Sequence, residues 1–168
     1  MSDAQRLVCF LHGKESGPWG TKIRYLAEIA KTRGWEAVSP DFRHTHDPHE
    51  RLSELLAEPP AAERLVLCGS SLGGYVAAMA CRELRPHGLF LMAPALYFPG
   101  FDEDPGDCPP LTVVTHGWRD DIVPPERALR FAEPRRAELH LFDDGHRLID
   151  SLDAVGRLFG ALLDQVTT

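Results

Sequence analysis

The sequence predicts an α/β fold: a doubly wound, mostly parallel six-stranded sheet with helices on both faces. Six short apolar runs are almost continuous rather than alternating, which is typical of strands covered on both sides. Segments with helical periodicity separate these runs, and such alternation indicates a parallel sheet with right-handed crossovers. The 168 residues suit one domain, residues 1–168, at ~100–200 residues per domain.

The predicted strands share one feature, a short run of mainly aliphatic and aromatic side chains. In chain order they cover residues 6–12, 36–40, 64–69, 88–93, 111–116 and 137–142. Because the carboxyl ends of parallel strands meet at one edge of a sheet, the loops that follow these runs are expected to form the ligand site.

The predicted helices lie where apolar residues recur at spacings of three and four. In chain order they cover residues 22–33, 72–84, 126–132 and 148–166, with a short additional helix at 49–56. The helix at 126–132 follows Pro124 and Pro125. Proline suits a helix start because the first N–H groups of a helix have no partner within it, so the N–H that proline lacks costs no hydrogen bond. Residues 94–110 contain five prolines and two glycines, which predicts a loop.

Charge and hydropathy exclude several classes of partner. Eighteen Lys and Arg against 25 Asp and Glu give a net charge of −7, so the chain is a poor candidate for binding nucleic acid. The longest mostly apolar stretch, residues 88–98, is 11 residues long and contains Pro94. It is too short for ~30 Å of hydrocarbon, so no membrane span is expected. The oligomeric state is not decided by the sequence.

The four cysteines, at positions 9, 68, 81 and 108, form no C-x-x-C pair. A zinc ribbon and a thioredoxin-like motif are therefore not expected. Residues 1–6 lack the charged-then-apolar pattern of a signal peptide. Free thiols without an export signal indicate a cytoplasmic protein.

A G-x-S-x-G motif at residues 69–73 lies between a predicted strand and a predicted helix. This is the context of a nucleophile elbow, whose sharp turn requires glycines such as Gly69 and Gly73 and holds Ser71 in strained geometry. The helix start behind the serine offers N–H groups to a developing oxyanion. The alternative is a glycine-rich phosphate-binding turn, but the P-loop ending and the Rossmann glycine spacing are missing.

A serine hydroxyl needs a base, and the base needs an orienting carboxylate. His146 follows the last predicted strand, and Asp120 follows the fifth, so both should share the sheet edge with Ser71. Asp121 is the rival acid. The oxyanion donors would be the backbone N–H groups of Leu72 and Lys14.

The motifs at residues 11–13 (LHG), 68–74 (CGSSLGG), 116–124 (HGWRDDIVP) and 145–146 (GH) resemble those of the α/β-hydrolase superfamily, and the chain order serine, aspartate, histidine agrees. The chain is most similar to small, lid-poor bacterial serine esterases. The resemblance implies Ser71 as nucleophile, Asp120 as acid and His146 as base. It also implies a minimal fold that lacks the first two strands of the family. Unlike dienelactone-hydrolase-like relatives, the chain has serine rather than cysteine as nucleophile.

Two further groups of residues bear on the site. The histidine-rich segment at 44–50 does not match the H-x-H-x-D-H pattern of metallohydrolases, because Pro48 takes the place of the aspartate, so no metal is expected. Aromatic side chains in loops after the strands are candidates for a substrate pocket. These are Trp19, Phe42, Tyr97, Phe98 and Trp118.

The sequence thus predicts a serine hydrolase that needs no cofactor and cleaves small carboxylic esters or thioesters through an acyl-enzyme. Small substrates are expected because so short a chain leaves little material for a long acyl tunnel. A peptidase or amidase with the same triad, or a non-catalytic binding module with the same fold, are the alternatives.

Overall fold

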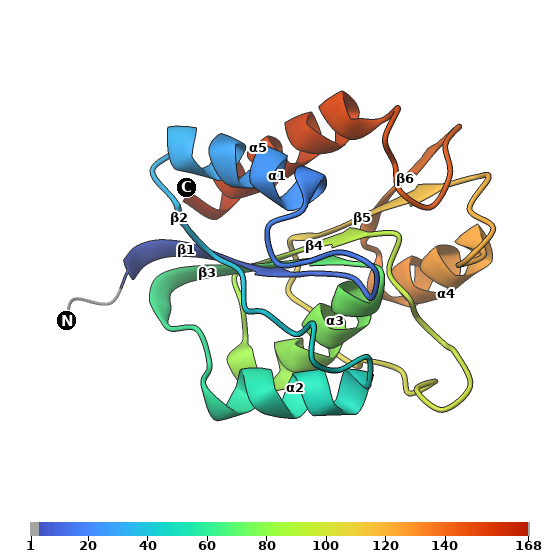
Figure 1. Cartoon of the computed structure of the whole chain (residues 1–168). Coiled ribbons are helices and arrows are strands. Elements are labelled where there is room, and N and C mark those ends of the chain that lie inside the picture. Colours follow the sequence, from blue (N-terminus) through green and yellow to red (C-terminus); the bar gives the residue numbers. More distant parts are fainter. Residues whose placement is uncertain (1–3, 168) are drawn as a thin grey trace.

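The computed structural model describes residues 4–167, and along these residues strands and helices alternate except where the fifth strand follows the fourth through a loop (Figure 1). The strands are β1 (Ala4–Leu11), β2 (Glu36–Val38), β3 (Ala62–Ser70), β4 (Gly88–Met92), β5 (Thr112–Gly117) and β6 (Glu138–Phe142). The helices are α1 (Thr21–Thr32), α2 (Pro48–Ala57), α3 (Leu72–Leu84), α4 (Pro125–Arg135) and α5 (Leu152–Thr167). Residues 1–3, part of the stretch without a signal-peptide pattern, and residue 168 lie outside the described residues.

The strands form one sheet in the order β2-β1-β3-β4-β5-β6, and every neighbouring pair is parallel. The predicted fold class is therefore confirmed, in the form of an entirely parallel sheet. All strand carboxyl ends consequently meet at one edge, and the loops after β1, β3, β5 and β6 lie together there.

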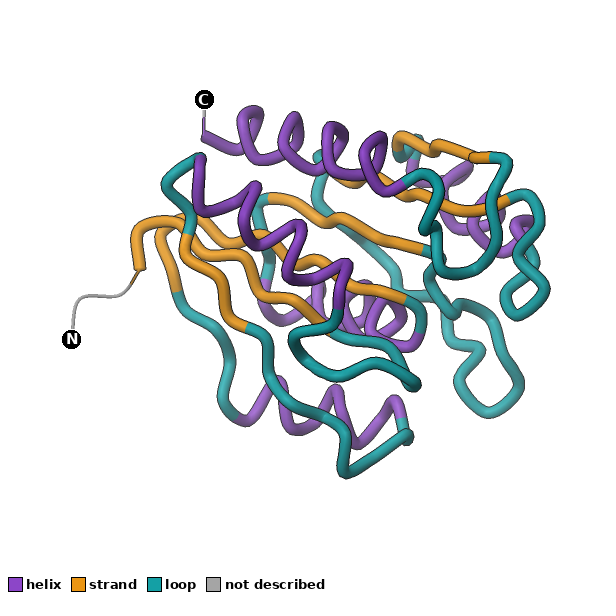
Figure 2. The backbone as a smooth tube through the Cα atoms, turned by 45° about the horizontal axis from the view of Figure 1, so that its top comes forward, coloured by secondary structure: helices purple, strands orange, loops and turns teal. Residues whose placement is uncertain are grey.

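Helices cover both faces of the sheet, with α1 and α5 on one side and α2, α3 and α4 on the other (Figures 1 and 2). Successive strand residues therefore enter different cores. Phe10 of β1 and Phe90 of β4 pack against Phe159 of α5, with ring centroids 6.0 and 5.3 Å apart. The neighbouring Leu11 joins Tyr75 of α3 in the opposite core. Burial on both faces explains why the strands read as continuous apolar runs.

The last helix begins at Leu152, four residues later than its apolar spacing predicts. Leu148 is fully buried against α5 but has a φ of +55°, so it belongs to the core without being helical. The spacing therefore identifies the buried face and misplaces the start. No helix within residues 4–167 has the length and apolarity to cross a bilayer.

Candidate active site

Ser71 occupies the sharp turn between β3 and α3, with φ +52° and ψ −117°. A left-handed φ is costly for a residue with a side chain, and it persists only where the surroundings fix it. Here the Ser71 N–H donates to the Met92 carbonyl at 3.0 Å, and the Ser71 carbonyl accepts from the Ala95 N–H at 2.9 Å. The end of β4 thus holds the serine in its strained conformation.

Glycines on both sides make this turn sterically feasible. A Cβ on Gly69 would overlap the Gly73 carbonyl, and a Cβ on Gly73 would overlap the Leu11 carbonyl. The motif therefore packs α3 directly against the ends of β1 and β3, which leaves no room for side chains at these positions.

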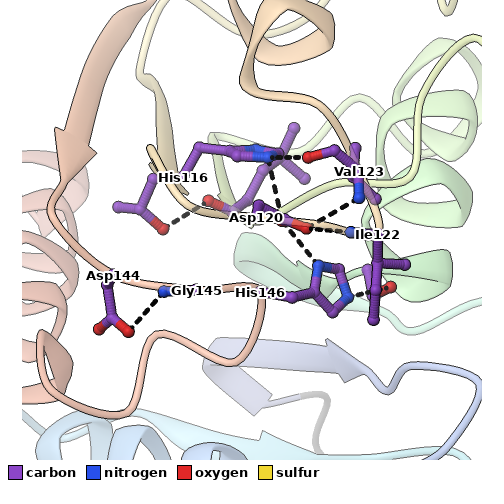
Figure 3. Close-up of polar contacts among 10 residues, drawn as sticks. His116, Asp120, Ile122, Val123, Asp144, Gly145 and His146 are labelled. Atoms are coloured by element: carbon purple, nitrogen blue, oxygen red, sulfur yellow. Dashed lines mark hydrogen bonds and ion pairs between the residues drawn. The ribbon is translucent and has the colours of Figure 1, made fainter.

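Three side chains from three different loops converge at this turn, and Figure 3 shows two of them, Asp120 and His146, pointing toward one another. His146, in the loop after β6, lies with Nε2 3.0 Å from Ser71 Oγ and Nδ1 2.7 Å from Asp120 Oδ2. The Asp120 side chain has no solvent exposure, whereas that of His146 is 14% exposed. The chain of contacts therefore runs from a buried carboxylate to a hydroxyl near the surface.

Asp120 is held by more than His146. Its Oδ1 accepts the backbone N–H groups of Ile122 and Val123 at 2.9 and 2.8 Å, and its Oδ2 lies 3.1 Å from His116 Nε2. Burial alone would raise the pKa of the carboxyl, but the hydrogen bonds from the two histidines and the two amides hold this pKa below its usual range. Asp120 is consequently ionised at neutral pH.

Asp121 takes no part in this hydrogen-bonded arrangement. Its side chain is exposed, and no hydrogen bond among the described residues joins it to His146. Of the two candidate acids, Asp120 is the one in contact with the imidazole.

His116 also takes part in this arrangement, and no role is assigned to it from the sequence. It is fully buried, and its Nε2 donates to the Val123 carbonyl at 2.8 Å while also facing Asp120. It therefore closes the turn that carries the acid. Its position four residues before Asp120 is visible in the sequence, but only the fold of the turn brings the two side chains together.

The loop after β1 passes beside Ser71 and rests on a buried guanidinium. A Cβ on Gly13 would lie 3.4 Å from Ser71 Cβ. Arg51 of α2 is fully buried and donates from Nη1 to the His12 and Gly13 carbonyls at 2.8 and 3.3 Å. In a trans peptide the carbonyl and the following N–H point in opposite directions, so this anchor turns the Lys14 N–H away from Arg51.

His12 is bonded through both ring nitrogens, which excludes it as a rival base. Nε2 accepts the Phe42 N–H at 2.9 Å, so Nδ1 carries the proton that is shared with the Gly13 carbonyl at 2.8 Å. Burial lowers the pKa of this imidazole, which keeps it neutral in this role.

The five aromatic pocket candidates differ widely in position. Trp19 and Trp118 are 47% and 61% exposed, whereas Phe42 and Tyr97 are buried. Tyr97 belongs to the predicted 94–110 loop, where its hydroxyl donates to Asp104 at 2.7 Å. Phe98 lies under the Arg127 guanidinium, 4.6 Å from its ring centroid. Their role in substrate binding stays a prediction.

A cleft of about 370 Å³ adjoins His146, and none of those five aromatics lines it. Its apolar wall is formed by Ile122 and Ile149, each 60% exposed. Sequence reasoning misses both isoleucines, because the residue type alone does not show whether an isoleucine side chain lies in the core or in a cleft. Their closeness in sequence to Asp120 and His146 is the only available signal.

The histidine-rich segment at 44–50 has a local structural role. His44 pairs with Glu54 at 2.7 Å, and Asp47 caps α2 by accepting the His49 N–H at 2.9 Å. Within residues 4–167, no group of three or more His, Cys, Asp or Glu side chains is arranged to hold a metal ion.

The chain matches the family model described as "Alpha/beta hydrolase family" over residues 10–166. The protein therefore belongs to the α/β-hydrolase family and is a hydrolase, as its resemblance to that superfamily implies. No curated protein matches the chain significantly.

Solved structures agree with this assignment. A hydrolase of the alpha/beta superfamily from Xanthomonas campestris is 34% identical, with a TM-score of 0.88 over 96% of this chain and 99% of that chain. Est1E from Butyrivibrio proteoclasticus is 17% identical, with a TM-score of 0.82 over 99% and 90% of the two chains. A serine hydrolase without a lid, also from Xanthomonas campestris, is 20% identical, with a TM-score of 0.70 over 96% and 83%. The last two show the fold alone.

Proposed function

We propose that this hydrolase cleaves small carboxylic esters or thioesters, with Ser71 as nucleophile, His146 as general base and Asp120 as the orienting acid. The observation that carries the proposal is the 3.0 Å distance between His146 Nε2 and Ser71 Oγ, together with the 2.7 Å contact behind it to Asp120. Positioned serine, imidazole and buried carboxylate are the parts that acyl transfer requires.

In the proposed reaction, Ser71 Oγ attacks the substrate carbonyl while His146 Nε2 takes the hydroxyl proton. The Leu72 N–H, in the first turn of α3, and the Lys14 N–H stabilise the oxyanion. The bond to the leaving group then breaks, and His146 returns the proton to the departing oxygen or sulfur. Water, activated by the same imidazole, releases the acid from Ser71. No step needs a cofactor.

The open surroundings of the site favour small substrates. His146 is partly exposed, and the 94–110 loop is fastened to α4 through Arg135, whose Nη2 donates to Asp104 at 2.7 Å. A cytoplasmic location is part of the proposal and rests on Cys9, Cys68, Cys81 and Cys108 all being free thiols.

The same triad could serve a peptidase or amidase, and the fold could serve a binding module without catalysis. A fluorophosphonate probe and p-nitrophenyl acetate separate these functions. We expect labelling at Ser71, ester turnover well above that of anilide analogues, and a loss of about 10³-fold or more in kcat for Ser71→Ala. Absence of labelling, or turnover equal to that of Ser71→Ala, would refute the enzyme; faster anilide than ester turnover would indicate an amidase.

A further inference from the structure

The cleft beside His146 combines three features that no role described so far requires. His146 is one of its lining residues, the exposed Ile122 and Ile149 line it as well, and so do the acidic residues Asp121 and Asp150. Ile122 and Ile149 come from separate loops and are equally exposed. Single exposed aliphatics are ordinary on a protein surface, but two that line the same cleft as His146 are candidates for a binding site.

The exposure of Ile149 is imposed by a rigid loop. Asp144 closes the loop by accepting the Gly145 N–H at 2.7 Å and the Ser151 N–H at 2.9 Å. The preceding Leu148 is fully buried in the core beneath α5, with its backbone in the left-handed region. With Leu148 anchored inward, the chain presents Ile149 outward.

Ile122 is also fixed through its backbone, and it belongs to a different loop from Ile149. Its backbone N–H donates to Asp120 Oδ1 at 2.9 Å, so it is tied directly to the acid of the triad (Figure 3). Ile122 thus belongs to the turn that carries Asp120, and Ile149 belongs to the loop that carries His146. The backbone contacts that position the triad therefore also position the two isoleucines.

The direction of proton transfer assigns a substrate part to this cleft. When the tetrahedral intermediate collapses, the carbon–oxygen bond to the alcohol breaks and the His146 Nε2 proton moves to that oxygen. The leaving alcohol must therefore lie on the His146 side of Ser71. His146 is among the residues that line the cleft and Ser71 is not, so the part of the alcohol that extends past the imidazole would occupy it.

We propose, on the basis of the function inferred above, that Ile122 and Ile149 form the leaving-group subsite and that it takes apolar, uncharged alcohols. The isoleucines bury the carbon chain of the alcohol. The carboxylates of Asp121 and Asp150 disfavour a negatively charged leaving group, and Arg147 offsets only part of this charge.

The test compares two ester series in the wild type and in the double variant Ile122→Ser/Ile149→Ser. In n-alkyl acetates, each added methylene of the alcohol should raise wild-type kcat/KM by about twofold to threefold, and the double variant should lose this gain. In ethyl esters of acids of increasing length, both proteins should respond alike. Leu129→Ser, which removes a comparably exposed aliphatic from α4 outside the cleft, should behave as the wild type in both series.

Charge selection is tested with methyl 4-acetoxybenzoate and 4-acetoxybenzoate, which carry neutral and anionic leaving groups. For the wild type, kcat/KM should be about fivefold or more higher for the neutral ester than for the anionic ester at low ionic strength. In Asp121→Asn/Asp150→Asn the ratio of these two kcat/KM values should be smaller. The leaving group of a fluorophosphonate probe is fluoride, which is too small to use the cleft. Labelling of Ser71 by this probe should therefore proceed equally in the wild type and in the Ile122→Ser/Ile149→Ser variant.

A changed response to acid length with an unchanged response to alcohol length would make the cleft an acyl pocket and overturn the proposal. If the double variant responds to alcohol length and to acid length as the wild type does, and Ser71 is still labelled, the leaving-group subsite is overturned but the proposed serine hydrolase mechanism is not. Failure of the wild type to be labelled at Ser71 would overturn the hydrolase mechanism and the subsite together.

Discussion

His146 Nδ1 and Asp120 Oδ2 lie 2.7 Å apart, although the two residues are on different loops. Because an ionised carboxylate only accepts hydrogen bonds, this contact places the imidazole proton on Nδ1. Nε2 is then left with its lone pair directed at Ser71 Oγ, 3.0 Å away. The carboxylate therefore selects the one tautomer in which the histidine can accept the serine proton.

This relationship predicts different effects for the two adjacent aspartates. Asp120→Asn should lower kcat by about 10³-fold or more, because an amide can donate to Nδ1 and so stabilise the wrong tautomer. Asp121→Asn should stay within about tenfold of the wild type, since its side chain is exposed and no hydrogen bond among residues 4–167 joins it to His146. Steady-state hydrolysis of p-nitrophenyl acetate measures both. Losses of similar size in the two variants would contradict the assignment of the acid.

The depressed pKa of Asp120 predicts a pH-dependent contribution to stability. In the unfolded chain an aspartate has a pKa of about 3.9, whereas the hydrogen bonds in the folded protein hold the pKa of Asp120 lower. The stabilisation is therefore complete above the unfolded value and is lost as the pH falls through the folded value. Urea unfolding at a series of pH values should show that the difference in the free energy of unfolding between the wild type and Asp120→Asn decreases below about pH 4. An advantage that is constant down to pH 2 would show that the carboxylate charge contributes nothing.

Sequence reasoning predicts the elements that rest on local chemistry. The strand–glycine–serine–glycine–helix order predicts α3 at residues 72–84 with the bounds that the structure has, because a nucleophile elbow couples a turn to a helix start. It cannot predict that Arg51 supports the loop at Gly13, since these residues lie 38 positions apart and the buried partners are carbonyls, which every residue has. The exposure of Ile149 depends on the same kind of long-range packing.

Arg51 is expected to contribute strongly to stability because its replacement leaves buried acceptors unpaired. Arg51→Met would strand the carbonyls of His12, Gly13 and Thr45, at a cost of about 3 kcal/mol in the free energy of unfolding. Arg43→Met is the matched control: Arg43 pairs with Asp41 at 2.6 Å but is 68% exposed, so its loss should change the free energy of unfolding much less than the loss of Arg51. Denaturant unfolding gives both values. Equal costs would show that the guanidinium is not a structural support of the loop.

Gly73, in the turn at Ser71, and Gly145, beside His146, should differ strongly in their tolerance of a side chain. Gly73→Ala places a Cβ onto the Leu11 carbonyl, and neither β1 nor α3 can move without disturbing the core, so we expect a destabilisation of at least about 3 kcal/mol or failure to fold. At Gly145 a Cβ meets no atom within 4 Å and φ is not left-handed, so Gly145→Ala should be neutral or slightly stabilising through a less flexible unfolded chain. Soluble yield and thermal unfolding of the two variants, measured side by side, test this. A Gly73→Ala protein that melts with the wild type would mean that α3 does not pack as closely on β1 as the structure has it.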